Sequence, residues 1–401
     1  MAGLFISRPG RFTALVRSVL IAFCIGAMWM PSPDALAGNE DSMLSTSPAL
    51  PGRSAAYDAT LAALPKGFRI CQTTRYIVFS NEKARWTQAQ LVRLEAACDQ
   101  FHRFARSVGL RPAPLRHKLV CVLFREKEDF SRFALDHDQM NSSWSLGYYS
   151  PRSDRIAFYN AEAEEDADEF ASKRVIATTI HEAIHQLSFH TRIQTIHVQY
   201  PLWINEGLAT SFETDSPNEA FGPDHEFDAR RHRFRTLLED GQLIPLRSFV
   251  ALDQMPDSGR ETVFTVYNQS YALFSWLARH RKKQLREYLA LMLKEPPGRP
   301  SAARHLELFE QAFGDADRLE AAWLTDERQQ LACGSASQSA PSGFRQMSVN
   351  EPICAAFETP CDRCGSSSLF QIEVGTRADV RIRPLNPAGP QGPMWLIGDS
   401  E

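Results

Sequence analysis

The segment His181-Glu182-Ala183-Ile184-His185 combines two histidines and a glutamate at a spacing that suits metal chemistry. Residues four apart on an α-helix lie one turn above each other, so both imidazoles would point the same way. Zinc prefers such neutral nitrogen ligands, together with an open position for water. Glu182, next to the first histidine, would take a proton from that water as a general base.

The motif also occurs by chance on amphipathic helices that carry two incidental histidines. Here Ile180, Ile184 and Leu187 repeat at helical spacing, so they would bury one side and leave the histidines on the adjoining face. A second short helix is predicted over 201–209, and it carries Glu206, separated by twenty residues from the second histidine. If this helix folds back antiparallel to the first, it presents Glu206 as the third ligand.

Other third ligands compete with Glu206 in the same part of the chain. His190 and His197 are alternatives, because both follow the motif closely and carry imidazoles. The metzincin arrangement is excluded, because it requires glycine and histidine where this chain has Ser188 and Thr191.

Together, the segments HEAIH and WINEGLATSFE resemble the zinc-binding motifs of the gluzincins, in particular the peptidase MA-like families. The resemblance implies that His181, His185 and Glu206 bind a Zn²⁺ ion, with Glu182 as the general base. It further implies that Glu213, seven residues after the glutamate ligand, interacts with a zinc-bound histidine without contacting the ion itself. The alternative for Glu213 is a solvated helix carboxylate.

The segment Tyr267–Leu273 resembles the Tyr-x-x-Gly/Ser-x-Ala-Leu sequence found in the clan of peptidases to which the gluzincins belong. By this resemblance, the Tyr267 hydroxyl stabilises the oxyanion of the tetrahedral intermediate, because a phenol remains protonated at neutral pH and can donate a hydrogen bond. Tyr271, one turn further on, is the reserve for the same role. Both tyrosines could instead belong to an aromatic packing stripe.

The overall pattern is most similar to a family of bacterial exported proteins of unknown function, DUF1570, over about residues 75–325. The chain lacks the Gly-x-Met-Glu-Asn strand with which aminopeptidases of the clan anchor the substrate amine. The resemblance therefore implies a zinc metalloendopeptidase that hydrolyses peptide bonds in a peptide or protein substrate. The alternatives are a zinc-binding scaffold without catalysis and a zinc amidase that acts on cell-wall peptides.

Short apolar runs and amphipathic segments predict an α+β fold around these residues. Residues 66–138 are predicted to form a small N-terminal α/β lobe. Residues 139–330 would form a gluzincin-type catalytic domain, in which a β-hairpin and sheet precede a mostly helical part. The hairpin strand Ile156–Tyr159 is expected to offer its edge to an extended peptide.

The N-terminus has the features of an export signal. Basic residues precede the apolar stretch Val19–Met30, and Ala35-Leu36-Ala37 has the small-x-small pattern of a cleavage site. We therefore expect a signal peptide over 1–37, cleavage near Ala37-Gly38, and a periplasmic or secreted product. A membrane anchor is the alternative, but the apolar run is shorter than the ~20 residues of a spanning helix. No stable membrane insertion is expected after cleavage.

Composition adds three expectations. A formal net charge of −4 gives no electrostatic reason to expect a nucleic-acid partner. Residues 38–65 are rich in Ser, Pro, Ala and Gly, which is typical of a linker. Seven cysteines follow position 37, and four of them lie in a predicted tail or module over 331–401. In an oxidising compartment two disulfides are favoured for these four, with a second zinc site or free thiols as alternatives.

Overall fold

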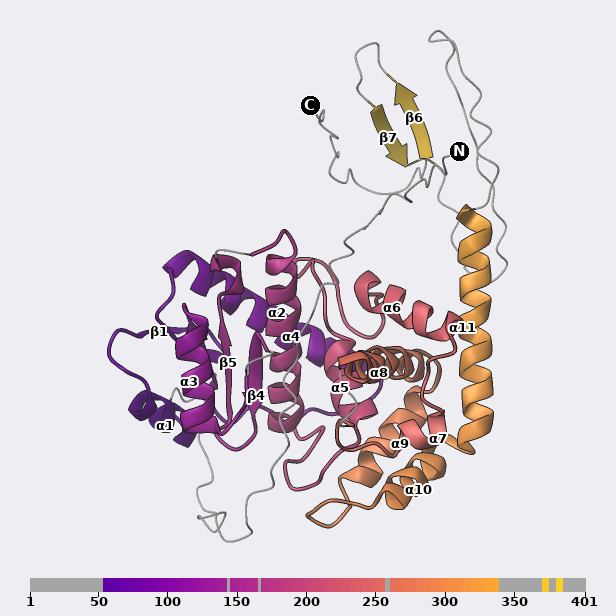
Figure 1. Cartoon of the computed structure of the whole chain (residues 1–401), viewed down its shortest axis with the longest axis horizontal. Helices are drawn as coiled ribbons and strands as arrows, with labels where there is room; N and C mark the ends of the chain where they lie inside the picture. The colour runs from indigo at the N-terminus through magenta and orange to yellow at the C-terminus, as the bar shows by residue number, and fades with distance from the viewer. Residues whose placement is uncertain are drawn as a thin grey trace, which may run out of the picture. The chain divides into compact units, whose positions relative to one another are not determined.

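The computed structural model describes residues 53–142, 145–164, 167–256, 260–338, 370–374 and 380–384 (Figure 1). The chain divides into two compact units, Met1–Ala332 and Cys333–Glu401. In the second unit, β6 (Phe370–Val374) pairs antiparallel with β7 (Val380–Pro384). The predicted signal peptide, its cleavage point and the side chains of the four C-terminal cysteines lie outside the described residues.

One five-stranded sheet lies in the described part of the first unit, with the strand order β1-β2-β3-β5-β4. The two inner pairings, β2 with β3 and β3 with β5, are parallel, whereas both outer pairings are antiparallel. The inner strands are continuous apolar runs, as expected for parallel strands that are covered on both faces. The bounds are Arg69–Gln72 for β1, Tyr76–Ser80 for β2, Leu119–Phe124 for β3, Gly147–Ser150 for β4 and Arg155–Tyr159 for β5.

Helices cover both faces of this sheet and continue into a mostly helical part of the unit (Figure 1). Their bounds are Ala55–Ala63 for α1, Ala84–Ser107 for α2, Lys127–Asp138 for α3, Ala171–His190 for α4, Leu202–Thr210 for α5, Asp228–Glu239 for α6, Leu246–Phe249 for α7, Arg260–His280 for α8, Lys282–Met292 for α9, Ala302–Phe313 for α10 and Ala316–Gln338 for α11. Among the described residues, we find no helix with the length and apolar character needed to cross a membrane.

The sheet separates two hydrophobic cores, because successive side chains of a strand point to opposite faces. Tyr76 and Val78 of β2 join the larger core, to which α2 and α4 contribute. Ile77 and Phe79 of the same strand join a smaller core with α1 and α3 (Figure 1). Helices thus cover both faces, and the fold is α+β, as the sequence predicts.

The predicted lobe and the predicted hairpin are parts of one sheet. Strand β3 lies in the region 66–138, β5 lies in the region 139–330, and Val120 of β3 is aligned with Arg155 of β5 in the parallel ladder. The two regions therefore share cores. Helix α1 also begins inside the predicted linker.

The expectation that strand Ile156–Tyr159 offers a free edge is wrong. This strand corresponds to β5, which pairs with β3 on one side and with β4 on the other. Both of its edges are used by ladder hydrogen bonds, so it cannot add a peptide strand. The strand at this end of the sheet is β4.

The helical part of the unit holds α5 against its neighbours. Trp203 of α5 is fully buried, and its ring centroid lies 4.9 Å from that of Tyr288 in α9 and 5.4 Å from that of Phe309 in α10. Such aromatic contacts bury a large apolar area and prefer specific orientations. They fix the position of α5, which matters because the residues that follow Trp203 include Glu206.

Candidate metal centre

Helix α4 brings His181 and His185 together on one face. Ile180, Ile184 and Leu187 are fully buried in the larger core and fix the rotation of the helix, as their spacing predicts. The two imidazoles then project from the adjoining face, with their Nε2 atoms 3.1 Å apart. Both side chains are buried, at 1% and 9% exposure of the residue.

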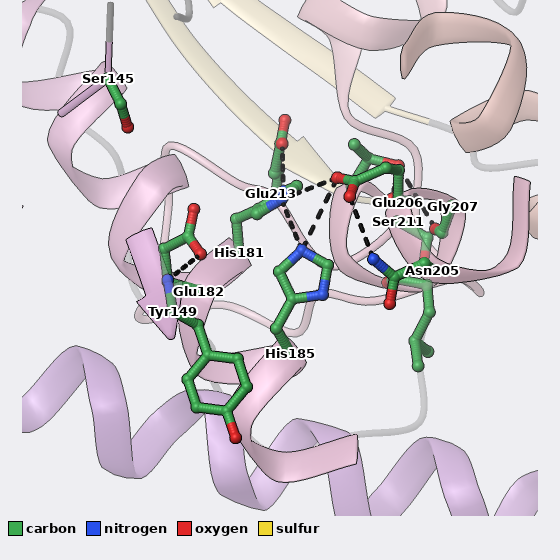
Figure 2. Close-up of polar contacts among 12 residues, drawn as sticks. Ser145, Tyr149, His181, Glu182, His185, Asn205, Glu206, Gly207, Ser211 and Glu213 are labelled. Carbon is green, nitrogen blue, oxygen red and sulfur yellow. Dashed lines mark hydrogen bonds and ion pairs between the residues drawn. The ribbon is translucent and has the colours of Figure 1, made fainter. Parts of the chain in front are cut away.

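Helix α5 adds the third side chain to this cluster. Glu206 Oε2 lies 3.3 Å from His181 Nε2 and 3.6 Å from His185 Nε2 (Figure 2). The other carboxylate oxygen, Oε1, accepts a hydrogen bond of 3.2 Å from Asn205 Nδ2. Glu206, which follows the helical motif after twenty intervening residues, thus lies next to the two histidines in the fold.

Gly207 lets α5 approach α8 closely enough to hold this position. A Cβ atom at Gly207 would lie 2.7 Å from the Ser270 carbonyl oxygen and 2.8 Å from Phe274 Cβ. Both distances are shorter than a van der Waals contact, and one of them involves backbone. The glycine after Glu206 is therefore required by packing between helices.

The three atoms fit a zinc ion. Ligands at the corners of a tetrahedron, each about 2.1 Å from zinc, lie about 3.4 Å from one another. The separations here are 3.1, 3.3 and 3.6 Å. Glu206 Oε2 is also buried without a hydrogen bond, which is unusual for a carboxylate oxygen. Two imidazoles and one carboxylate are, moreover, the protein ligands of a zinc site with an open fourth position.

The histidines and carboxylates of the cluster shift one another's pKa values because opposite charges lie close together. Burial disfavours a charged imidazole, but the contacts with Glu206 and Glu213 outweigh it and raise the pKa of His181 to about 10. Burial likewise disfavours the Glu206 carboxylate, but the two neighbouring histidines outweigh it and lower its pKa. Glu206 is therefore ionised at neutral pH, as a metal ligand must be.

Glu213 and Arg230 form a second layer behind His181. Glu213 Oε1 lies 2.9 Å from His181 Nδ1, and Arg230 donates to both carboxylate oxygens at 2.7 and 2.8 Å. Burial alone would raise the pKa of Glu213, but Arg230 and His181 outweigh it and lower the pKa. The sequence suggested the supporting role for Glu213. Arg230 was missed, because no motif spacing ties it to the histidines.

Glu182 lies beside the cluster, at the edge of the sheet. Its Oε2 atom accepts a hydrogen bond of 2.8 Å from the Tyr149 backbone N–H of β4 (Figure 2). Burial raises the pKa of Glu182, although both histidines act in the opposite direction. A raised pKa suits a carboxylate that must both accept and return a proton. Sequence reasoning missed Tyr149 because a backbone donor leaves no signal in residue type.

Part of the chain matches a known family model. Residues 175–298 match DUF1570, described as a protein family of unknown function. The matched segment includes the histidines, Glu206, Glu213 and Tyr267, whereas Tyr149 lies before it. No curated protein matches the chain. The family description assigns no activity.

Tyr267 lies beside the cluster, and Tyr271 is occupied elsewhere. The Tyr267 ring centroid is 6.2 Å from that of His181, and the Arg230 guanidinium lies 5.7 Å from the same tyrosine ring. Tyr271 instead accepts a hydrogen bond of 3.0 Å from the Phe227 backbone N–H, just before α6. The first tyrosine of the segment is therefore the one next to His181.

His190 and His197, the alternative third ligands, are not part of this cluster. His190 Nε2 lies 2.6 Å from Asp154 Oδ1, in a separate group of side chains. His197 is exposed. Of the histidines in the described residues, His181 and His185 are the two grouped with Glu206.

Proposed function

We propose that this chain is an exported zinc-dependent metalloendopeptidase that uses His181, His185 and Glu206 to bind the ion. The observation that carries the proposal is the convergence of three ligand atoms, separated by 3.1 to 3.6 Å, beside a glutamate that belongs to the same helical motif. A scaffold that only binds metal has no need of a carboxylate at this position.

A zinc ion in this site would polarise the substrate carbonyl and lower the pKa of water toward ~7. Glu182 then accepts the proton of the attacking water and returns it to the leaving nitrogen. Its contact with the Tyr149 N–H keeps one carboxylate oxygen fixed, so the other is free to exchange the proton. Tyr267 donates a hydrogen bond to the oxyanion that develops on the carbonyl.

The edge of β4 is the part of the sheet that lies next to Glu182. The Tyr149 N–H donates to Glu182 and hence points away from β5. Glu182 therefore lies along the outer edge of β4. An extended peptide that lies along this edge would run past Glu182, but it would not form a regular backbone ladder, because the Tyr149 N–H donates to Glu182 and the Gly147 N–H donates to Ser145 Oγ.

The export part of the proposal rests on the N-terminal sequence. Expression of the full chain in a bacterial host, followed by N-terminal sequencing of the extracytoplasmic product, tests it. We expect the mature chain to begin at or near Gly38. Recovery of the uncut chain in the cytoplasm would contradict export and leave the metal proposal untouched.

Replacement of the base tests the catalytic part. Glu182→Gln keeps the shape of the side chain and should retain zinc, while hydrolysis of a peptide library falls by about 10²- to 10⁴-fold. Glu219→Gln, an exposed carboxylate, is the matched control and should leave both properties unchanged. Retained cleavage by Glu182→Gln would refute the assigned base.

The same assay separates the alternatives. Purified cell-wall fragments are digested in parallel with the peptide library. Cleavage of the fragments alone would favour a cell-wall amidase. A wild-type chain that binds zinc and cleaves neither substrate would favour a scaffold.

A further inference from the structure

A second group of metal-binding side chains lies at the C-terminal end of α4. It consists of His117, Asp154 and His190, each of which offers one ligand atom within 4.8 Å of the others. The rings of His117 and His190 meet edge to face, with centroids 5.2 Å apart. The three residues come from segments that lie far apart in the sequence, so the fold creates this group.

This group is separate from the candidate metal centre. His190 follows His185 by five residues, which corresponds to about 7.5 Å along the helix axis. His190 Nε2 lies 2.6 Å from Asp154 Oδ1, whereas His185 Nε2 faces Glu206. Helix α4 therefore contributes histidines to two different clusters.

The surroundings of His117 favour a ligand. Its Nδ1 atom lies 3.1 Å from the Lys118 carbonyl oxygen. When Nδ1 carries the ring proton it donates to this carbonyl, and Nε2 keeps a lone pair. Histidines that bind metals usually donate their other ring N–H to a carbonyl or carboxylate in this way.

Charge and access also suit a divalent cation. With both imidazoles in the neutral form that binds metals, the group would carry a net charge of −1. The His190 and Asp154 side chains are 14% and 30% exposed, and both line a cavity of about 580 Å³. Water from this cavity would complete the coordination. The exposed Arg192 lines the same cavity, and solvent and salt screen its repulsion of a cation.

We propose that His117, Asp154 and His190 form a second zinc site of lower affinity than the first. Its affinity is lower because the ion must displace the short hydrogen bond between His190 and Asp154. At the first site the corresponding contact, between His181 Nε2 and Glu206 Oε2, is longer, at 3.3 Å. Tyr149 connects the second group with the candidate metal centre. Its hydroxyl donates to Asp154 Oδ1 at 3.3 Å, and its backbone N–H donates to Glu182.

Zinc titration of the metal-free chain tests this site. Accessible thiols are first alkylated with iodoacetamide, so that they cannot bind the ion, while Cys98 and Cys121 are buried in the core. Bound zinc is then counted by equilibrium dialysis and mass spectrometry. We expect two equivalents for wild type and a loss of the weaker one in His117→Ala and in His190→Ala. His137→Ala removes an exposed histidine of α3 as the matched control and should bind as wild type does.

Failure of this site and failure of the first site give different results. Glu206→Ala should lose the tight equivalent and keep the weak one. The second-site proposal is overturned if both His117→Ala and His190→Ala bind as many equivalents as wild type, whatever Glu206→Ala does.

Should a variant fail to fold, histidine NMR of the wild-type chain decides. The ring signals of His117 and His190 should shift with the second equivalent of zinc. Unchanged signals throughout the titration would overturn the proposal.

Discussion

His181 Nδ1 lies 2.9 Å from Glu213 Oε1, and this contact orients the imidazole. Because Nδ1 faces Glu213, Nε2 is the atom that faces Glu206 and His185, and it gains the lone pair of a ligand when zinc displaces its proton. The bidentate contact of Arg230 keeps Glu213 ionised and in place. The His181 ring is thus oriented before any ion binds.

Glu213→Gln should weaken zinc binding by about 10- to 100-fold, because the amide supports the imidazole less strongly than a carboxylate does. Competition with a metal indicator dye measures the change. Asp215→Asn is the matched control, since Asp215 pairs with Lys173 nearby and does not contact a histidine. Equal affinities for wild type and Glu213→Gln would show that the contact plays no part in metal binding.

Arg230→Met should destabilise the metal-free chain by about 3–5 kcal/mol, because it leaves the Glu213 carboxylate buried without its counter-charge. Denaturant unfolding measures this loss. Adding Glu213→Gln to the same chain removes the orphaned charge and should recover part of the stability. If the two substitutions are simply additive, the residues do not act as a pair.

Zinc affinity should rise with pH. The pKa of His181 is about 10 in the metal-free chain, so at pH 7 this histidine carries a proton that zinc must displace. Lower pH favours the protonated free form, and the affinity should increase by about tenfold per pH unit between pH 6.5 and 8.5. Calorimetry in two buffers of different ionisation enthalpy counts the protons released. A flat affinity across this range would contradict the coupling.

Tyr267→Phe should lower kcat by about 10²- to 10³-fold and leave KM nearly unchanged, because the lost hydroxyl acts on the developing oxyanion. Tyr271→Phe is the matched comparison on the same helix. It removes the acceptor for the Phe227 N–H and should cost about 1–3 kcal/mol of stability while kcat is retained. If the two variants have the same kcat, Tyr267 has no part in the chemistry.

The sequence could predict the parts of the site that depend on local geometry. His181 and His185 lie on one helix, where spacing alone determines that they share a face. To place Glu206 beside the histidines, helix α5 must fold back against α4, and the twenty residues between His185 and Glu206 are enough for that turn. The α+β class also followed from the alternation of apolar runs and amphipathic segments.

Other features depend on pairing between distant segments. The position of β5 between β3 and β4 brings together segments on either side of α3, and no local pattern encodes that order. Arg230 reaches Glu213 only because α6 folds over the cluster. The His117 group likewise combines residues before, between and after strands β4 and β5. These relationships arise from tertiary packing.

Zinc content of the purified mature chain, compared between wild type and Glu206→Ala, tests the central claim most directly. After dialysis that removes weakly held metal, mass spectrometry should find about one zinc ion per wild-type chain and far less in the variant. Glu219→Ala, which removes an exposed carboxylate, should match wild type. If Glu206→Ala keeps as much zinc as wild type, the three-ligand site proposed here is wrong.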